Sequence, residues 1–113
     1  MGLVTSIGND RGTVTRNLLE LRHGIERHPE LQGEDSPVKI AGTVKEFEVS
    51  SPDPEDWEYP EKYRVPRAVL RSFSPHVLYA WCSLSQAIED ASLSEEDLHD
   101  PDAGLYTSSG GSM

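Results

Sequence analysis

Cys82 is the only thiol in the chain and the obvious candidate for a nucleophile. A catalytic thiolate needs a base or a cationic group beside it. The nearest histidine in the sequence, His76, precedes Cys82 by six residues, so on a helix their side chains point about 120° apart. A cysteine in the middle of a helix is typically buried and inert. The sequence therefore assigns no catalytic role to Cys82.

The histidines and acidic residues give no metal site. Metal-binding motifs place their ligands at fixed spacings of a few residues. The acidic run at residues 89–102 lacks the alternating oxygen ligands and the central glycine of a calcium loop. None of the histidines neighbours another ligand at a metal-binding spacing; they are His23, His28, His76 and His99. We therefore expect no metal, no cofactor and no complete catalytic site.

One basic cluster runs against the acidic net charge. It comprises Lys62, Arg64, Arg67 and Arg71, with no acid between them. Arg67 and Arg71 are four residues apart and share a face if this stretch is helical. A basic spot on an acidic protein is a candidate dock for a phosphate or an acidic partner. The alternative is a solvated helix face with local ion pairs.

A glycine-rich run near the carboxyl terminus could also approach a ligand. It consists of Ser109, Gly110, Gly111 and Ser112. Glycines let the backbone come close to a bound group, but this run has neither the lysine of a phosphate-binding loop nor the spacing of a dinucleotide fingerprint. A flexible linker is the alternative interpretation.

The first half of the chain predicts one helix, one strand and two irregular segments. Apolar residues at three- and four-residue spacing predict a helix over residues 11–23, which Gly24 would end in a left-handed conformation. Polar residues, prolines and a glycine predict a loop at 26–37, and alternation of apolar residues predicts a strand at 38–44. Three prolines among charged residues make 50–62 a surface excursion without regular structure.

The second half begins with the clearest helix. Ser74 at the N-cap and Pro75 at the first position are strong start signals. Residues 103–108 read as a strand. The apolar stripe of the long helix comprises Val77, Trp81, Leu84, Ile88 and Ala91. Such a stripe needs a sheet to cover it, so the sequence predicts an α/β layer fold with most of its sheet missing.

Composition limits the partners and the setting. The 113 residues fit one small domain, and 20 acidic against 10 basic residues give a net charge of −10. This charge repels nucleic acid and anionic membranes. A single cysteine forms no internal disulfide and fits a reducing, cytoplasmic setting. No apolar run approaches the roughly 20 residues that span a bilayer.

Four segments, in order, resemble the β-ketoacyl-acyl-carrier-protein synthases. Residues 1–9 are similar to that family's opening, in which a strand ends in a Gly-x-Gly-x-Val-Thr/Ser-x-x-Gly-Asn turn. Residues 18–25 resemble its first helix, which closes with Gly-Ile, and residues 79–94 its long amino-terminal helix. Residues 104–111 resemble the following strand and glycine turn. The likeness covers nearly the whole chain and is closest to the elongating synthases of the first and second types.

The resemblance implies the amino-terminal part, residues 1–113, of a thiolase-like α/β layered fold that is usually dimeric. The implied reaction is a decarboxylative Claisen condensation between an acyl thioester and malonyl-carrier protein, in fatty acid or polyketide biosynthesis. The partner is then an acyl carrier protein with its phosphopantetheine thioester. The family's nucleophilic cysteine and its two histidines lie beyond the glycine turn. The 113 residues alone are therefore expected to be inactive, and Cys82 inherits no role.

Two groups of site residues follow from the resemblance. Arg67 and Arg71 align with basic positions that contact the acidic carrier protein in the family. Ala68 stands where a further basic residue often sits, which removes one charge from the dock. Gly110, between Ser109 and Gly111, aligns with the turn that lines or gates the acyl-chain pocket, and a glycine there implies an open gate.

Two other functions remain as hypotheses. The chain could be a small non-enzymatic interaction module that uses the basic cluster and an exposed apolar helix face, or part of a catalytically inactive synthase paralogue. A cooperative thermal transition of the isolated chain would favour the module. Aggregation or a collapsed, non-cooperative state would favour a fragment with an uncovered core.

Overall fold

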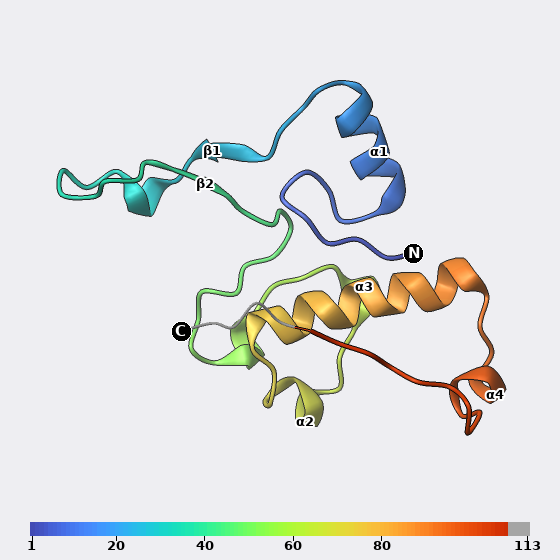
Figure 1. Cartoon of the computed structure of the whole chain (residues 1–113). Coiled ribbons are helices and arrows are strands. Elements are labelled where there is room, and N and C mark those ends of the chain that lie inside the picture. Colours follow the sequence, from blue (N-terminus) through green and yellow to red (C-terminus); the bar gives the residue numbers. More distant parts are fainter. Residues whose placement is uncertain (109–113) are drawn as a thin grey trace.

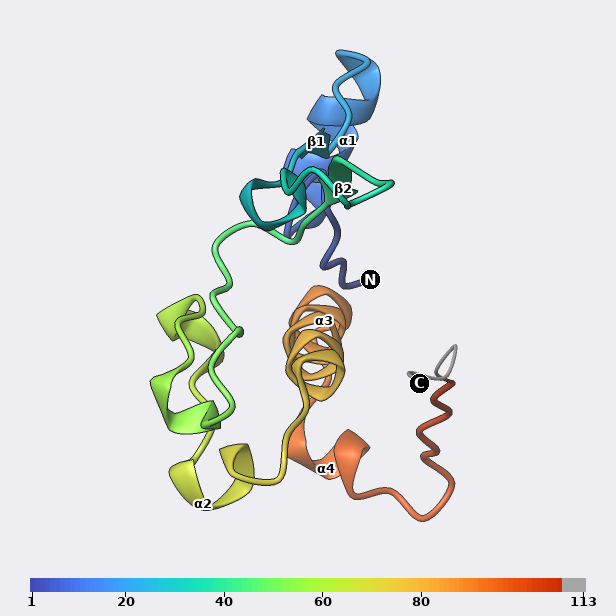
Figure 2. The same cartoon turned by 90° about the vertical axis from the view of Figure 1, so that its left-hand side faces the viewer.

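The computed structural model describes residues 1–108. Helix α3 crosses the middle of the molecule, with α1 and a β-hairpin on one side of it and the segment that leads into α2 on another (Figures 1 and 2). The helices are α1 (Arg11–Leu19), α2 (Arg67–Leu70), α3 (Pro75–Ala91) and α4 (Glu95–Leu98); the strands are β1 (Ile25–Arg27) and β2 (Ile40–Gly42); and 3₁₀ turns cover Pro29–Leu31, Pro54–Asp56 and Glu61–Tyr63.

The chain is more extended than a typical domain of its length. Its radius of gyration is 16.4 Å and its principal extents are 55 × 37 × 26 Å. A compact domain of this size has a radius of gyration of about 13 Å. The hairpin extends away from α3, and residues 99–108 run back beside α3 but apart from the other elements (Figures 1 and 2).

Helix α1 begins where the sequence predicts and ends earlier. The Asp10 carboxylate accepts hydrogen bonds from the backbone N–H of Thr13 at 2.9 Å and from its hydroxyl at 2.8 Å, and these bonds lower the pKa of Asp10. The helix stops at Leu19, because Leu21 takes the left-handed conformation (φ 56°). The prediction that Gly24 ends this helix is therefore wrong. A Cβ on Gly24 would lie 2.2 Å from the Ser6 carbonyl oxygen, so close backbone approach explains that glycine.

The two strands form an antiparallel hairpin. Ile25 pairs with Gly42, and Arg27 pairs with Ile40. The predicted strand at 38–44 is thus present only over Ile40–Gly42, and the predicted loop at 26–37 begins inside β1. Ile40 is more than half exposed, so the alternating pattern does not face a core.

The predicted strand at 103–108 is wrong. These residues form no ladder with any part of the chain that the structure describes, and Leu105 and Tyr106 are 68% and 97% exposed. An extended segment becomes a strand only when a neighbour accepts its backbone hydrogen bonds. Within residues 1–108 the structure is therefore a mixed α/β arrangement with a two-stranded sheet, and the expected layered sheet is not formed by these residues.

Helix α3 starts and stops as its local signals indicate. It begins at Pro75 after Ser74, although the Ser74 hydroxyl makes no capping hydrogen bond, and it ends where Ser92 adopts φ 54°. Ser94 and Asp97 then form the reciprocal hydrogen bonds of a capping box at the start of α4. The sequence Ser94-Glu95-Glu96-Asp97 is typical of such a capping turn, and the structure forms it.

The buried face of α3 differs from the predicted stripe. Leu78 and Cys82, one turn apart, are fully buried, whereas Val77 and Trp81 are 43% and 37% exposed. The residues that cover Leu78 and Cys82 come from the preceding segment: Trp57, Tyr63, Val65 and Leu70. Because this segment packs on one side of α3, the neighbouring side is left open.

The proline-rich segment at 50–62 follows the surface for most of its length but supplies part of this core. Trp57 is 9% exposed, and its indole N–H donates to the Ser51 carbonyl at 2.8 Å. The 3₁₀ turn Pro54–Asp56 is ordered between these two residues. The expectation of a surface segment without regular structure is therefore corrected: the segment contains a 3₁₀ turn, and its tryptophan is buried.

The polar side of α3 holds the start of the chain. The Gln86 side chain accepts from the Leu3 N–H at 3.2 Å and donates to the Leu3 carbonyl at 3.2 Å and the Asn9 carbonyl at 2.7 Å. Asp90 pairs with the amino group of Met1 at 2.7 Å and with Arg11 at 3.0 Å. Gln86 and Asp90 continue the four-residue spacing of Leu78 and Cys82, so one stripe along α3 carries tertiary contacts over most of its length.

Candidate functional site

The turn α2 presents Arg67 and Arg71 on one outward face. The Pro66 carbonyl accepts from the N–H groups of Val69 and Leu70 at 2.9 Å, which closes the turn. Leu70 is 5% exposed and anchors the turn in the core, so the residues around it face solvent. The side chains of Arg67 and Arg71 are 81% and 70% exposed. Residues Arg67–Leu70 are helical and Arg71 is their C-cap, so the condition under which the two arginines share a face is met.

Both guanidinium groups bind one carboxylate, which belongs to Glu55. Arg67 Nη2 lies 3.3 Å from Glu55 Oε2, and Arg71 Nε lies 2.5 Å from Glu55 Oε1. The Glu55 side chain is 20% exposed, far less than either arginine. Two positive charges therefore share one negative charge, and the net charge of the trio is +1. This partner was not predictable from the sequence pattern, because Glu55 lies 16 residues before Arg71.

The other two basic residues of the cluster, Lys62 and Arg64, lie in different surroundings. Lys62 Nζ lies 4.7 Å from the centroid of the Tyr63 ring, in cation–π geometry. Arg64, with Tyr59 and Glu61, lines a separate shallow hollow. Among the described residues, only Arg67 and Arg71 of this cluster share a carboxylate. The candidate docking surface therefore consists of Arg67 and Arg71 rather than of all four basic residues.

The predicted pocket turn of Ser109, Gly110 and Gly111 lies outside the described residues. Its assignment as the acyl-chain gate stays a prediction.

Cys82 is buried as expected. Its side chain is fully covered, and burial raises the pKa of its thiol from 9.0 to about 11. A buried neutral thiol is a poor nucleophile because the thiolate is the reactive form. Within residues 1–108 there is also no group of three histidine, cysteine, aspartate or glutamate side chains placed to hold a metal ion.

The buried thiol leads to a prediction about its reactivity. Iodoacetamide at pH 8 is expected to alkylate Cys82 far more slowly in the folded chain than in urea, measured by mass spectrometry. Because burial raises the pKa of the thiol, its contribution to stability is fully present and constant below pH 9, and it is lost as pH rises from 9 toward 11. Equal alkylation rates with and without urea would contradict the buried placement.

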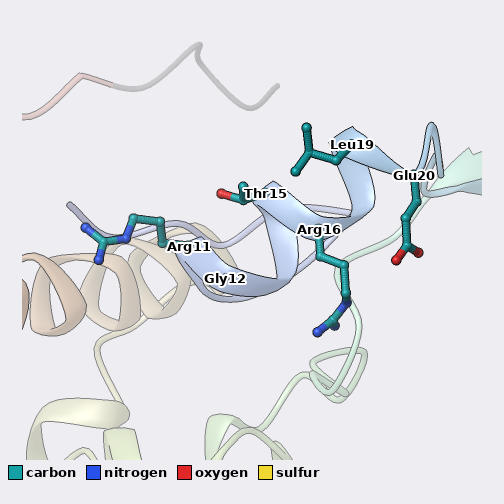
Figure 3. A pocket seen from close by; sticks show the side chains of 6 residues that line it. All are labelled: Arg11, Gly12, Thr15, Arg16, Leu19 and Glu20. Atoms are coloured by element: carbon teal, nitrogen blue, oxygen red, sulfur yellow. The ribbon is translucent and has the colours of Figure 1, made fainter.

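A hollow on the outer side of α1 is a weaker candidate. It has a volume of about 430 Å³ and is lined by Arg11, Gly12, Thr15, Arg16, Leu19 and Glu20 (Figure 3). All of these residues come from α1 or its cap, and their side chains spread outward rather than converge. Arg11 is already paired with Asp90. A ligand site normally encloses its ligand with several elements, so we assign no site here.

Comparison with known proteins identifies the family. A family model described as the Beta-ketoacyl synthase N-terminal domain matches residues 1–113. The chain belongs to the β-ketoacyl synthase family. The resemblance inferred from the four sequence segments is thus confirmed. No helix in the part of this synthase segment that the structure describes is long and apolar enough to cross a membrane.

Curated relatives of this synthase segment carry one name, 3-oxoacyl-(acyl-carrier-protein) synthase 1. The protein from Escherichia coli strain K12 is 35% identical over 112 residues, which are 98% of this chain and 24% of the relative. The protein from Haemophilus influenzae is 30% identical over 109 residues, or 96% of this chain and 24% of the relative. This chain therefore spans about a quarter of the length of these relatives. No solved structure gives a significant match.

The structure explains one motif of the synthase family in physical terms. Asn9, the asparagine of the Gly-Asn turn, is 8% exposed. Its side-chain amide donates to the Lys45 carbonyl at 2.6 Å and to the Glu46 carboxylate at 3.1 Å. Glu46 has φ 62°, a conformation that is uncommon for a residue with a side chain. Asn9 therefore holds a tight turn 36 residues further along the chain.

Proposed function

We propose that this chain is the amino-terminal portion of a 3-oxoacyl-acyl-carrier-protein synthase that elongates acyl chains in fatty acid biosynthesis. In that reaction an acyl group passes from a carrier thioester to a cysteine thiolate. Malonyl-carrier protein then loses CO₂, and its enolate attacks the enzyme-bound acyl thioester. The buried Cys82 has none of the properties of that nucleophile, so the 113 residues alone are inactive. The intact enzyme is a cytoplasmic dimer in this proposal.

The role of this segment is to dock the acidic carrier protein through Arg67 and Arg71. The observation that carries this proposal is their joint exposure on α2, at positions where the family resemblance implies carrier contacts. Guanidinium groups suit an acidic partner because each offers five N–H donors in a fixed fork. Glu55 occupies only part of this donor set. The Ser109–Gly111 turn would line the acyl pocket as an open gate.

The test is charge reversal at Arg71 in the synthase that contains this segment. Arg71→Glu is expected to lower kcat/KM for carrier-bound substrate about tenfold or more, because a carboxylate now faces the acidic partner. The rate with a small thioester analogue should change little, since such a substrate makes no contact with α2. Steady-state kinetics with both substrates measures the difference.

Arg64→Glu serves as the matched control, because it makes the same charge change at an exposed residue that does not share Glu55. Equal losses with both substrates in Arg71→Glu, or equal carrier-specific losses in the two variants, would remove the docking role of α2.

A further inference from the structure

Glu55 is held in place by the turn that contains it. The Asp53 carboxylate accepts from the Glu55 N–H at 2.9 Å and caps the 3₁₀ turn Pro54–Asp56. Immediately after the turn, Trp57 enters the core and donates to the Ser51 carbonyl. The Glu55 backbone is therefore fixed on both sides, and its carboxylate has a defined position beside α2.

The carboxylate lies on the inner side of the two arginines. Its side chain is 20% exposed, against 81% for Arg67 and 70% for Arg71. The closest contacts to Glu55 use Nη2 of Arg67 and Nε of Arg71. Each guanidinium has five N–H donors, so most donors stay available to a partner that approaches from solvent. Glu55 thus lowers the charge of the docking surface without covering it.

We propose that Glu55 is an internal competitor that weakens carrier docking at Arg67 and Arg71. This inference rests on the docking role proposed above. A carboxylate of the carrier protein meets a surface of net charge +1 rather than +2, and it shares the guanidinium donors with Glu55. Both the electrostatic steering and the contact energy are then reduced. Weak docking suits a partner that must deliver its thioester and leave in each cycle.

Removing only the charge of Glu55 separates competition from positioning. Glu55→Gln keeps the size of the side chain and one of the two oxygens that contact the arginines, so one guanidinium contact can persist, but the competing negative charge is lost. If Glu55 mainly oriented the arginines, the variant would bind the carrier no more tightly than the natural chain. If Glu55 competes, the variant binds more tightly.

The matched control is Asp56→Asn. Asp56 is the next residue of the same turn, and its carboxylate accepts from the Ser51 hydroxyl at 3.1 Å, a bond that asparagine can retain. Among residues 1–108, Asp56 forms no ion pair with Arg67 or Arg71. The two variants change the net charge of the chain equally, so a difference between them reports on the contact with the arginines.

The experiment titrates the synthase that contains this segment, and its variants, with acyl carrier protein at about 20 mM and about 1 M salt, and measures Kd by fluorescence anisotropy. At low salt, Glu55→Gln is expected to lower Kd about three- to fivefold, the scale of exposed ion pairs. Asp56→Asn should change Kd much less. At about 1 M salt the difference should nearly vanish, because the Debye length falls to about 3 Å. An unchanged or higher Kd in Glu55→Gln, or equal effects of the two variants, would overturn the proposal.

Arg71→Glu in the same titration distinguishes this inference from the proposed function. If Arg71→Glu weakens carrier binding while Glu55→Gln leaves it unchanged, docking stands and the competitor role falls. If the carrier does not bind, or binds all variants equally, both proposals fail together. Circular dichroism spectra of the variants that match the natural chain establish that the fold is retained.

Discussion

Shortening Leu78 to alanine is expected to lower the free energy of unfolding by about 2–5 kcal/mol, the usual range for leucine-to-alanine changes at a fully buried site. Leu78 is 0% exposed and packs in the cluster that joins α3 to the segment before it. The loss combines the transfer free energy of the missing methyl groups with the cost of the cavity they leave. Urea titration followed by tryptophan fluorescence measures it as a lower midpoint.

The same substitution should weaken carrier binding, because Leu70, which anchors α2, belongs to the cluster around Leu78. Leu78→Met keeps the side-chain volume and is expected to cost less than about 1.5 kcal/mol, so it serves as the control. If alanine and methionine shifted the midpoint equally, cavity formation at this position would not be the cause. A natural chain without a cooperative transition would itself favour a fragment over a self-sufficient module.

Gly2→Ala is expected to lower the free energy of unfolding by about 1–3 kcal/mol, the usual cost of inserting atoms into a filled space. A Cβ at this position would lie 1.7 Å from the Ser83 carbonyl oxygen, which belongs to the backbone of α3. The first residues must then move away from α3, and the hydrogen bonds between Leu3 and Gln86 are lost with them. The urea midpoint and hydrogen exchange at Leu3 both report the change.

Gly33 provides the control for this substitution. A Cβ at Gly33 would meet no atom within 4 Å, so Gly33→Ala should leave the midpoint nearly unchanged. A midpoint for Gly2→Ala as high as that for Gly33→Ala would mean that the amino-terminal segment does not pack on α3 as described.

Local signals in the sequence predicted the parts of the fold that local interactions determine. Ser74 and Pro75 mark the start of α3, and Ser94 and Asp97 form their capping box, because each of these features needs only neighbours in the sequence. The spacing of Arg67 and Arg71 likewise placed them on one face of α2. The family resemblance came from the order of such local motifs, and the family match confirms it.

Contacts between distant segments were not predictable in the same way. The apolar residues of α3 suggested a face around Val77 and Trp81, but the face around Leu78 is buried because Trp57 and its neighbours pack there. Leu21, rather than Gly24, takes the left-handed turn after α1, which residue preferences alone do not favour. The strand expected at 103–108 lacks a hydrogen-bonding neighbour within the described residues.

The charge partner of the candidate docking residues was not predictable from the sequence either. Sequence patterns grouped four basic residues and left out Glu55, since nothing in a proline-rich segment indicates which charge it will meet across the fold. The partnership becomes visible only when the 3₁₀ turn Pro54–Asp56 is placed against α2.

Helix α3 makes two sets of contacts: Leu78 and Cys82 pack on the segment that carries α2, and Gln86 and Asp90 bind residues 1–11. Neighbouring positions on a helix differ by about 100° around its axis, so a shift of one residue would break both sets of contacts at once. The helix is therefore held in a single orientation about its own axis. Helix α3 therefore sets the position of the turn at residues 5–9 relative to Arg67 and Arg71.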